Sequence, residues 1–266
     1  MRTSSPAGVP VSVVERISLV LETFNGAGPL TLAQVTSRTG LPRSSVHRLL
    51  EQLTNTGWLA RSPEQTYELG VKAYEMGQAA LNQNRLLHGA RPIMQAFAHR
   101  TGLTIQLAVI SRGDTVYLAK VNGRASGPTP TAVGQRVPAH LTAVGKAQLA
   151  FAEQSGRRPL FGELRRTGEG APARRTPQSV TTEAQLADDL AAVRNRGAAF
   201  DRGEAFPGLG CVGVSLGPPD HVYGNLAGIS VCAPVTSLDY RTLVGQVRVA
   251  AREIWDRCVA MDLASH

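Results

Sequence analysis

Residues 31–69, TLAQVTSRTGLPRSSVHRLLEQLTNTGWLARSPEQTYEL, contain the pattern of two short helices, a tight break and a β-hairpin. Thr31 supplies a side-chain acceptor for the start of a first helix, and Gly40 can adopt the left-handed conformation that ends it. Pro42 has a fixed φ and no amide hydrogen, so it suits the first position of the second helix. The segment therefore predicts a helix-turn-helix.

The predicted second helix, 42–56, is amphipathic. Its apolar residues Val46, Leu49, Leu50 and Leu53 recur at helical spacing, so they form one stripe that faces a core. Polar residues near the start of such a helix can reach base edges in a DNA major groove. A solvated surface helix would show the same pattern, so the helix alone does not decide between the two interpretations. The residues that we predict to contact DNA here are Arg43, Ser44, Ser45, His47 and Arg48, with Thr31 at the start of the first helix.

The residues after Gly57 favour the DNA interpretation. Two β-prone segments, 58–61 and 66–69, are joined by Ser62-Pro63-Glu64-Gln65, a connection of hairpin length. Two helices, a break and a hairpin within about 40 residues are typical of a winged helix-turn-helix. Arg61 and Gln65 would then approach the phosphate backbone, and double-stranded DNA is the expected partner.

The length and composition predict an α+β protein of two domains. Its 266 residues are 42% hydrophobic, which allows a core in each domain. No run approaches the roughly 18 apolar residues of a membrane helix, and the start MRTSSPAGVP lacks the apolar region of a signal peptide, so we expect a cytoplasmic protein with no membrane partner. The wide spacing of Cys211, Cys232 and Cys258 predicts thiols rather than a disulfide framework or a zinc site.

The positive charge does not itself indicate DNA binding. The formal net charge is +8, yet the chain through Leu69 has six arginines against five glutamates. Much of the excess lies in residues 157–175, where six arginines and two glutamates stand among glycines and prolines. We interpret that segment as a solvated, mobile surface, and a contact with DNA or a partner stays open as the alternative.

Patterns outside the wing predict the remaining organisation. We expect a disordered tail at 1–10, a winged domain at 11–69 that includes an amphipathic helix from Val11 to Phe24, a linker helix at 70–84, and a larger domain at 85–262. In the larger domain the sequence predicts helices at 86–101, after Thr142, at 183–196 and at 238–261, a hairpin around Arg112-Gly113-Asp114, and strands at 211–216 and 225–233.

Two glycine motifs suggest enzymes, but their context argues against both. GLGCVG at 208–213 matches a dinucleotide-binding fingerprint, yet it continues into VSL and two prolines, where no helix can begin. GVSLG at 213–217 matches a nucleophile elbow, but the same prolines follow, and the six histidines show no spacing that supplies a base. We predict no enzyme, catalytic residue, cofactor or metal, with a small-molecule hydrolase carrying an accessory winged domain as the alternative.

Several segments resemble the IclR family of bacterial transcription regulators. They are SVVERISLVLETF, LTLAQVTSRTGLPRSSVHRLLEQLTNTGWL, YELGVKAYEMG, GLTIQLAVISRGDTVYLAKV, VPAHLTAVGKAQLAF, VRNRGAAFDRGEAFPGLGCVGVSL and NLAGISVCAP. The resemblance covers nearly the whole chain and is weakest at 156–177. It implies a winged helix-turn-helix, a linker helix and a GAF-like effector-binding domain whose antiparallel sheet is flanked by helices. It also implies dimers or tetramers that bind inverted-repeat operator DNA and respond to a small organic effector.

The resemblance further implies an effector site, because relatives build theirs from positions that match this chain. If the loop at 142–146 opens a helix, its amides can hold a carboxylate or carbonyl oxygen, and Asp201 or Ser230 can bind hydroxyl or amine groups. For each of the two cysteines in the set, buried packing is the alternative interpretation. The implied set is Ala143, Val144, Gly145, Asp201, Cys211, Ser230 and Cys232.

Three positions depart from the family pattern. Many relatives have Ser where Cys232 stands, a basic residue where Gly210 stands and His where Ala205 stands. The implied pocket is therefore less polar. This favours a less hydrophilic ligand than the small hydroxy- or keto-acids that the family often senses.

Overall fold

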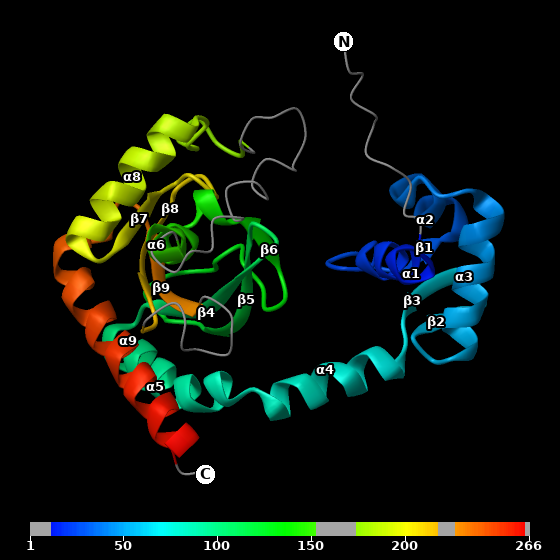
Figure 1. The fold of residues 1–266 in the computed structure, drawn as a ribbon, viewed down its shortest axis with the longest axis horizontal. Helices are drawn as coiled ribbons and strands as arrows, with labels where there is room; N and C mark the ends of the chain where they lie inside the picture. The colour runs from blue at the N-terminus through cyan, green and yellow to red at the C-terminus, as the bar shows by residue number, and fades with distance from the viewer. Residues whose placement is uncertain (1–11, 153–173, 218–226, 264–266) are drawn as a thin grey trace. The chain divides into compact units, whose positions relative to one another are not determined.

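The computed structural model describes residues 12–152, 174–217 and 227–263. The chain divides into two compact units, Met1–Asn84 and Arg85–His266 (Figure 1). The predicted tail at 1–10 and most of the Arg-rich segment at 157–175 lie outside the described residues. Within the described ranges, no helix is both long enough and apolar enough to cross a membrane.

The first unit is a winged helix-turn-helix with a long helix after the wing. β2 and β3 pair as the predicted hairpin, and β1 adds a third antiparallel strand beside β3 that the sequence patterns did not predict. The elements are α1 (Val13–Glu22), β1 (Leu30–Thr31), α2 (Leu32–Thr39), α3 (Arg43–Asn55), β2 (Leu59–Arg61), β3 (Thr66–Leu69) and α4 (Val71–Gln83).

Local capping fixes where the helices of this unit begin and end. The Thr31 hydroxyl accepts the amide of Gln34 at 3.3 Å, and the Gln34 side chain accepts the Thr31 amide at 2.8 Å, which is a capping box. Gly40, at φ 67°, ends α2 as predicted. The prediction that Pro42 is the first helical residue was wrong by one position. Pro42 has an extended ψ of 135° and caps α3, which begins at Arg43.

The predicted apolar stripe of α3 is buried in the core of the first unit. Val46 and Leu50 are 0% exposed, and the stripe packs with side chains from α1, α2 and the wing. Tyr67 of β3 joins the same cluster, so the wing is packed onto the helices. This packing leaves the opposite side of α3 in solvent.

A six-stranded antiparallel sheet forms the centre of the second unit, with strand order β6-β5-β4-β9-β8-β7. The turn between β4 and β5 uses Arg112 at φ 51° and Gly113 at φ 78°, and two successive positive φ angles are typical of a type I′ hairpin turn. The strands are β4 (Thr104–Ser111), β5 (Asp114–Val121), β6 (Arg136–Pro138), β7 (Ala199–Arg202), β8 (Leu209–Ser215) and β9 (Ala227–Pro234).

Helices cover both faces of this sheet. α5 (Arg85–Thr101) and α9 (Tyr240–Leu263) pack together on one face, and a short helix η1 (Ala139–Leu141) leads into α6 (Ala143–Ala152), which lies on the other face with α8 (Glu183–Arg196) (Figure 1). On β8, Val212 enters the core against α5 and α9. Its neighbour Cys211 packs instead with Ala143 of α6. Alternate residues of β8 thus pack against helices on opposite faces of the sheet.

A buried ion cluster joins α6, α8 and the loop after β7. The Lys146 Nζ lies 2.6 Å from Asp189 Oδ2 and 2.8 Å from both carboxylate oxygens of Glu204. The Lys146 and Glu204 side chains are only 1% and 10% exposed. Burial raises the pKa of Glu204, and the Lys146 ammonium opposes that rise. The ammonium therefore supplies the counter-charge of a buried carboxyl group.

Replacing this lysine by an apolar residue of similar length tests the cluster. We expect Lys146→Met to lower the free energy of unfolding by about 3–5 kcal/mol, because it leaves Glu204 buried without its counter-charge. Urea denaturation followed by circular dichroism measures the change. Arg252→Met is the matched control, since Arg252 pairs with Asp256 in solvent, where its side chain is 84% exposed. An equal effect of both variants would contradict the role of the cluster.

Candidate DNA interface and effector site

Ser44, His47 and Arg48 lie on the side of α3 away from its buried stripe, and Arg43 and Ser45 flank the stripe at the first turn of the helix. Arg43, Ser44 and Arg48 are exposed, and Ser45 and His47 are partly exposed. The His47 Nδ1 lies 3.5 Å from Glu51 Oε2, with both side chains about half exposed. The structure thus places Ser44, His47 and Arg48 on one accessible face, with Arg43 and Ser45 accessible beside it.

The two predicted wing residues contact each other. The Arg61 guanidinium donates a hydrogen bond to Gln65 Oε1 and lies 5.5 Å above the Tyr67 ring. Gln65 adopts φ 61°, so the wing turns at this residue. Thr31 is partly buried and caps α2, which gives it a structural role. Its contact with DNA, like those of Arg61 and Gln65, stays a prediction.

Four of the predicted effector residues meet on the α6 face of the sheet. Asp201 on β7 is the register partner of Cys211 on β8, which is the partner of Cys232 on β9. Ser230 lies two residues before Cys232 and therefore on the same face. All four are buried, with exposed fractions of 2% for Asp201, 6% for Cys211, 2% for Ser230 and 1% for Cys232.

The start of α6 lies directly against this row. A Cβ atom at Gly213 would lie 2.4 Å from the carbonyl carbon of Ala143 and 2.5 Å from the amide nitrogen of Val144, so only glycine permits this approach. The Thr142 hydroxyl accepts the amide of Gly145 at 3.0 Å. The first amides of a helix have no acceptor within the helix. The amides of Ala143 and Val144 are therefore the polar groups of α6 that can bind a ligand beside this row.

Asp201 has an unusual environment for a carboxylic acid. Its Oδ1 accepts the amides of Gly203 at 3.0 Å and Glu204 at 2.7 Å. Burial, reinforced by the nearby Glu204 carboxylate, raises the pKa of Asp201 to about 7 despite these hydrogen bonds. Near neutral pH this group is therefore present in both its acid and its carboxylate form.

Sequence reasoning missed three buried polar residues beside the cysteines. Burial raises the pKa of the Tyr117 hydroxyl well above its usual value, and the thiols of Cys232 and Cys211 are the next causes. Gln106 Nε2 donates to Thr131 Oγ1, and both side chains are buried. The signal was present for Gln106, because a glutamine between Ile105 and Leu107 is polar in an otherwise apolar strand.

The two glycine motifs lie in and around β8, where their glycines permit close packing of the strand against its neighbours. Gly208-Leu209-Gly210-Cys211-Val212-Gly213 runs into β8, and no helix begins after that strand among the residues described up to 217. A Cβ at Gly210 would lie 3.1 Å from the Cα of Val235, so this glycine permits a close backbone approach. Ser215 is a strand residue, as predicted, and its hydroxyl donates to the Ala227 carbonyl at 3.4 Å.

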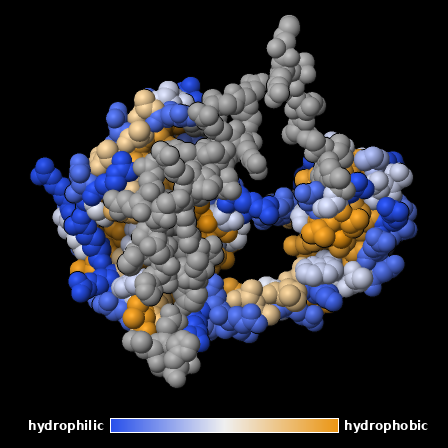
Figure 2. All heavy atoms as spheres, viewed as in Figure 1, coloured by the Kyte–Doolittle hydropathy of each residue, from blue (hydrophilic) through white to orange (hydrophobic). Residues whose placement is uncertain are grey.

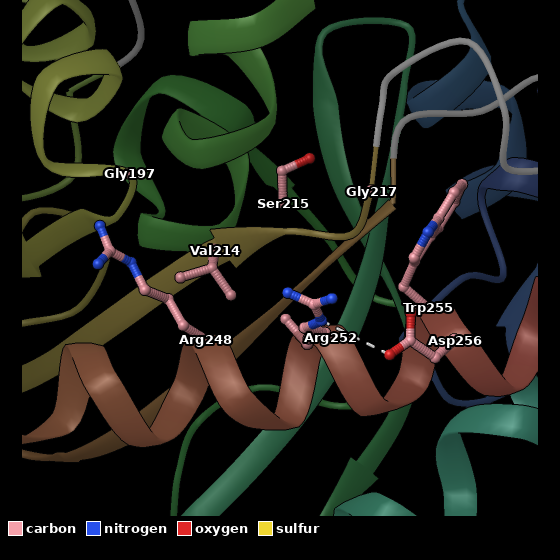
Figure 3. A pocket seen from close by; sticks show the side chains of 9 residues that line it. Gly197, Val214, Ser215, Gly217, Arg248, Arg252, Trp255 and Asp256 are labelled. Carbon is pink, nitrogen blue, oxygen red and sulfur yellow. Dashed lines mark ion pairs between the residues drawn. The ribbon is translucent and has the colours of Figure 1, made fainter.

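A separate cavity of about 380 Å³ lies between β8 and α9, on the other side of the sheet (Figure 3). Arg248, Arg252 and Trp255 of α9 line it, and none of the predicted effector residues does. Its basic groups are engaged, since Arg248 donates to the Arg196 carbonyl and Arg252 pairs with Asp256. The α6 face, where buried polar side chains converge, is therefore the stronger candidate for a specific ligand site.

Comparison with known families agrees with both units. Residues 13–63 match the IclR helix-turn-helix domain, and residues 78–256 match the bacterial transcriptional regulator IclR C-terminal domain. The second match alone covers more than half of the chain. The predicted resemblance to this family is thereby confirmed.

Individual relatives match over most of their length. The chain is 28% identical to the regulator XynR of Escherichia coli K12 over 77% of this chain and 80% of XynR. It is 28% identical to BhcR of Paracoccus denitrificans, covering 92% and 86% of the two chains. A solved IclR homolog from Microbacterium hydrocarbonoxydans, complexed with 4-hydroxybenzoate, is 26% identical with a TM-score of 0.76, covering 94% and 100%. These relatives give the hydrolase alternative no support. The chain belongs to the IclR family of bacterial transcriptional regulators and is not an enzyme.

Proposed function

We propose that this regulator binds inverted-repeat operator DNA through α3 and the wing. The observation that carries the proposal is the exposure of Ser44 and Arg48 opposite a buried apolar stripe, with Arg43 also exposed at the first turn of α3. An arginine at such a position can bind guanine with two hydrogen bonds, and serine can bind bases or phosphates. Arg61 and Gln65 would contact the phosphate backbone from the wing. Because the operator DNA that it would bind lies in the bacterial cytoplasm, we place the protein there.

We further propose that a small organic acid binds on the α6 face of the sheet. The amides of Ala143 and Val144 suit a carboxylate, while Asp201 and Ser230 suit hydroxyl groups of the ligand. Phe206 packs against two apolar clusters of this region, one that contains Tyr117 and Val144 and one that contains Ala143 and the two cysteines. These neighbours favour a weakly polar or aromatic acid, and the 4-hydroxybenzoate of the Microbacterium relative is the first compound to test. A coupling of about 1–3 kcal/mol between ligand and DNA would be sufficient for regulation.

Self-association is the third part of the proposal. Figure 2 shows hydrophobic side chains at the surface over α1, where Val13 and Val14 are 61% and 72% exposed. On α4, Val71 and Tyr74 are both 68% exposed and Leu81 is 36% exposed. At about 100° per residue these three side chains share one face of the helix. Exposed apolar stripes of this kind favour a dimer or a tetramer.

Replacing one α3 arginine tests the DNA interface. We expect Arg48→Ala to weaken binding to DNA from upstream of the encoding gene and its neighbours by about 5- to 150-fold, because a base-contacting arginine contributes roughly 1–3 kcal/mol. Fluorescence anisotropy at several salt concentrations measures the affinity. Arg252→Ala removes the same charge from the other unit and should leave the affinity unchanged. Equal losses in both variants, or no salt-sensitive binding to any fragment, would refute the interface.

The unusual pKa of Asp201 predicts how stability depends on pH. Its folded pKa of about 7 exceeds the ordinary aspartate pKa of 3.8, so between these values the folded chain holds a proton that the unfolded chain has released. Stability should therefore fall as the pH rises through this window, by at most about 1.4 kcal/mol per pH unit from this group. Asp201→Asn keeps the acceptor for the two amides and should reduce the slope.

Urea denaturation between pH 4.5 and 7.5 makes this comparison. Asp239→Asn is the control, because hydrogen bonds from Thr242 lower the pKa of Asp239, which places its titration below the window. Glu204, whose pKa is also raised, will leave some slope in the Asp201 variant. An unchanged slope in Asp201→Asn would contradict the assignment.

A charge on the apolar face of α4 tests self-association. We expect Tyr74→Glu to reduce the molar mass in sedimentation equilibrium towards the 28.2 kDa of one chain, because it places a carboxylate in the apolar contact. Gln83→Glu adds the same charge on the opposite side of the helix and should leave the mass unchanged. A monomeric parent protein would refute this part of the proposal.

A further inference from the structure

Two thiols lie in contact at the centre of the candidate effector site. The Sγ atoms of Cys211 and Cys232 are 2.9 Å apart, and both residues are in the free thiol form. The Cys211 thiol donates to the sulfur of Cys232, whose thiol donates to Gln106 Oε1 at 3.5 Å. The second sulfur is thereby oriented by a buried partner.

The backbone register places the two cysteines opposite each other on β8 and β9, at a pair whose geometry a disulfide can span. The Leu216 amide donates to the Ala227 carbonyl, and the Val235 amide donates to the Gly208 carbonyl, at opposite ends of the β8–β9 ladder. Hydrogen-bonded and non-hydrogen-bonded pairs alternate along an antiparallel ladder, so the register pair Cys211–Cys232 is a non-hydrogen-bonded one. In such pairs the Cα atoms lie about 4.5 Å apart, within the range that a disulfide spans.

We propose that Cys211 and Cys232 form an oxidisable dithiol. A small peroxide would oxidise the pair to a cross-strand disulfide between β8 and β9. The sulfurs would have to move less than about 1 Å, from contact to the roughly 2.05 Å of an S–S bond. The fold therefore holds the pair ready for the bond without a rearrangement of the strands. Cys258 is a buried cysteine of α9, which packs on the opposite face of the sheet, so it serves as an internal reference.

The chemistry balances with hydrogen peroxide as the oxidant. One sulfur, as its thiolate, attacks a peroxide oxygen; the O–O bond breaks, giving a sulfenic acid and a hydroxide that takes up the released proton. The other sulfur then attacks the sulfenic sulfur, the S–S bond forms, the S–O bond breaks, and the leaving hydroxide takes the second thiol proton. Two thiols and one peroxide become one disulfide and two waters, with two electrons passing from sulfur to oxygen.

Burial of the two thiols determines how much thiolate is present and which oxidants can reach the pair. The hydrogen bond to Cys232, together with burial, raises the pKa of the Cys211 thiol, so little of it is thiolate at neutral pH. A small uncharged oxidant fits this enclosed site better than a bulky or charged one. The closed disulfide would remove the donor to Gln106 Oε1 and both thiol hydrogens beside Asp201. Peroxide would thus change the polar groups at the same place where we propose that an organic acid binds.

Thiol counting on the full-length protein tests the proposal without knowledge of the effector. The folded protein is incubated with millimolar hydrogen peroxide, treated with catalase, unfolded, alkylated with iodoacetamide and weighed by mass spectrometry. The untreated chain should take up three adducts, one for each cysteine. The oxidised chain should take up one, on Cys258, and lack two hydrogen atoms. Peptide mapping should find Cys211 linked to Cys232.

Cysteine variants show whether the disulfide depends on the proximity of Cys211 and Cys232 or on a general reactivity of the thiols with peroxide. Cys258→Ser should still form the disulfide, whereas Cys211→Ser and Cys232→Ser should not, with folding checked by circular dichroism. Three adducts after peroxide, a link that involves Cys258, or sulfinic acid without the disulfide would overturn the proposal. So would equally fast closure in urea, because the fold would then not create the proximity. These outcomes are independent of whether 4-hydroxybenzoate or any other acid binds.

Discussion

Burial of the α3 stripe is the constraint on which the DNA-binding unit depends. Val46 and Leu50 have no exposed surface, so α3 has one rotation about its axis that satisfies the core. A shift of one residue would turn the helix by about 100° and bring polar side chains into that core. The outward position of Ser44 and Arg48 is thus a consequence of apolar packing. The wing reinforces it, because Tyr67 packs into the same cluster.

The effector-binding unit depends on a comparable constraint at β8, which is covered by helices on both faces. Gly213 lets the α6 backbone approach one face, and Gly210 lies against Tyr240 and Val235. Since the sheet has no open face here, its polar side chains cannot be solvated and must find partners inside. Asp201, the cysteine pair and Gln106 are gathered on one face for this reason, and such clusters of perturbed groups are typical of functional sites.

The sequence predicted elements with strong local signals and missed those without them. The helix Glu183–Arg196 was predicted to the residue, because Thr182 caps its start and Gly197, at φ 64°, ends it. The short strands β1, β6 and β7 were not predicted, since two to four residues show too little alternation and depend on their neighbours in the sheet.

The candidate sites show the same division. The outward face of α3 followed from periodicity alone, but the effector residues came only from the family resemblance. Lys146 was not assigned a role, although a lysine within the apolar run AVGKAQLAF is a sign of a buried partner. Its partners Asp189 and Glu204 are 43 and 58 residues away in the chain, and no local pattern connects them.

Footprinting of the DNA upstream of the encoding gene and its neighbours tests the central claim most directly. The claim is that two copies of the α3 face read one operator. The account predicts two protected half-sites, arranged as an inverted repeat with centres about one helical turn, or a multiple of it, apart. Protection of a single half-site, or binding that does not depend on the DNA sequence, would contradict it.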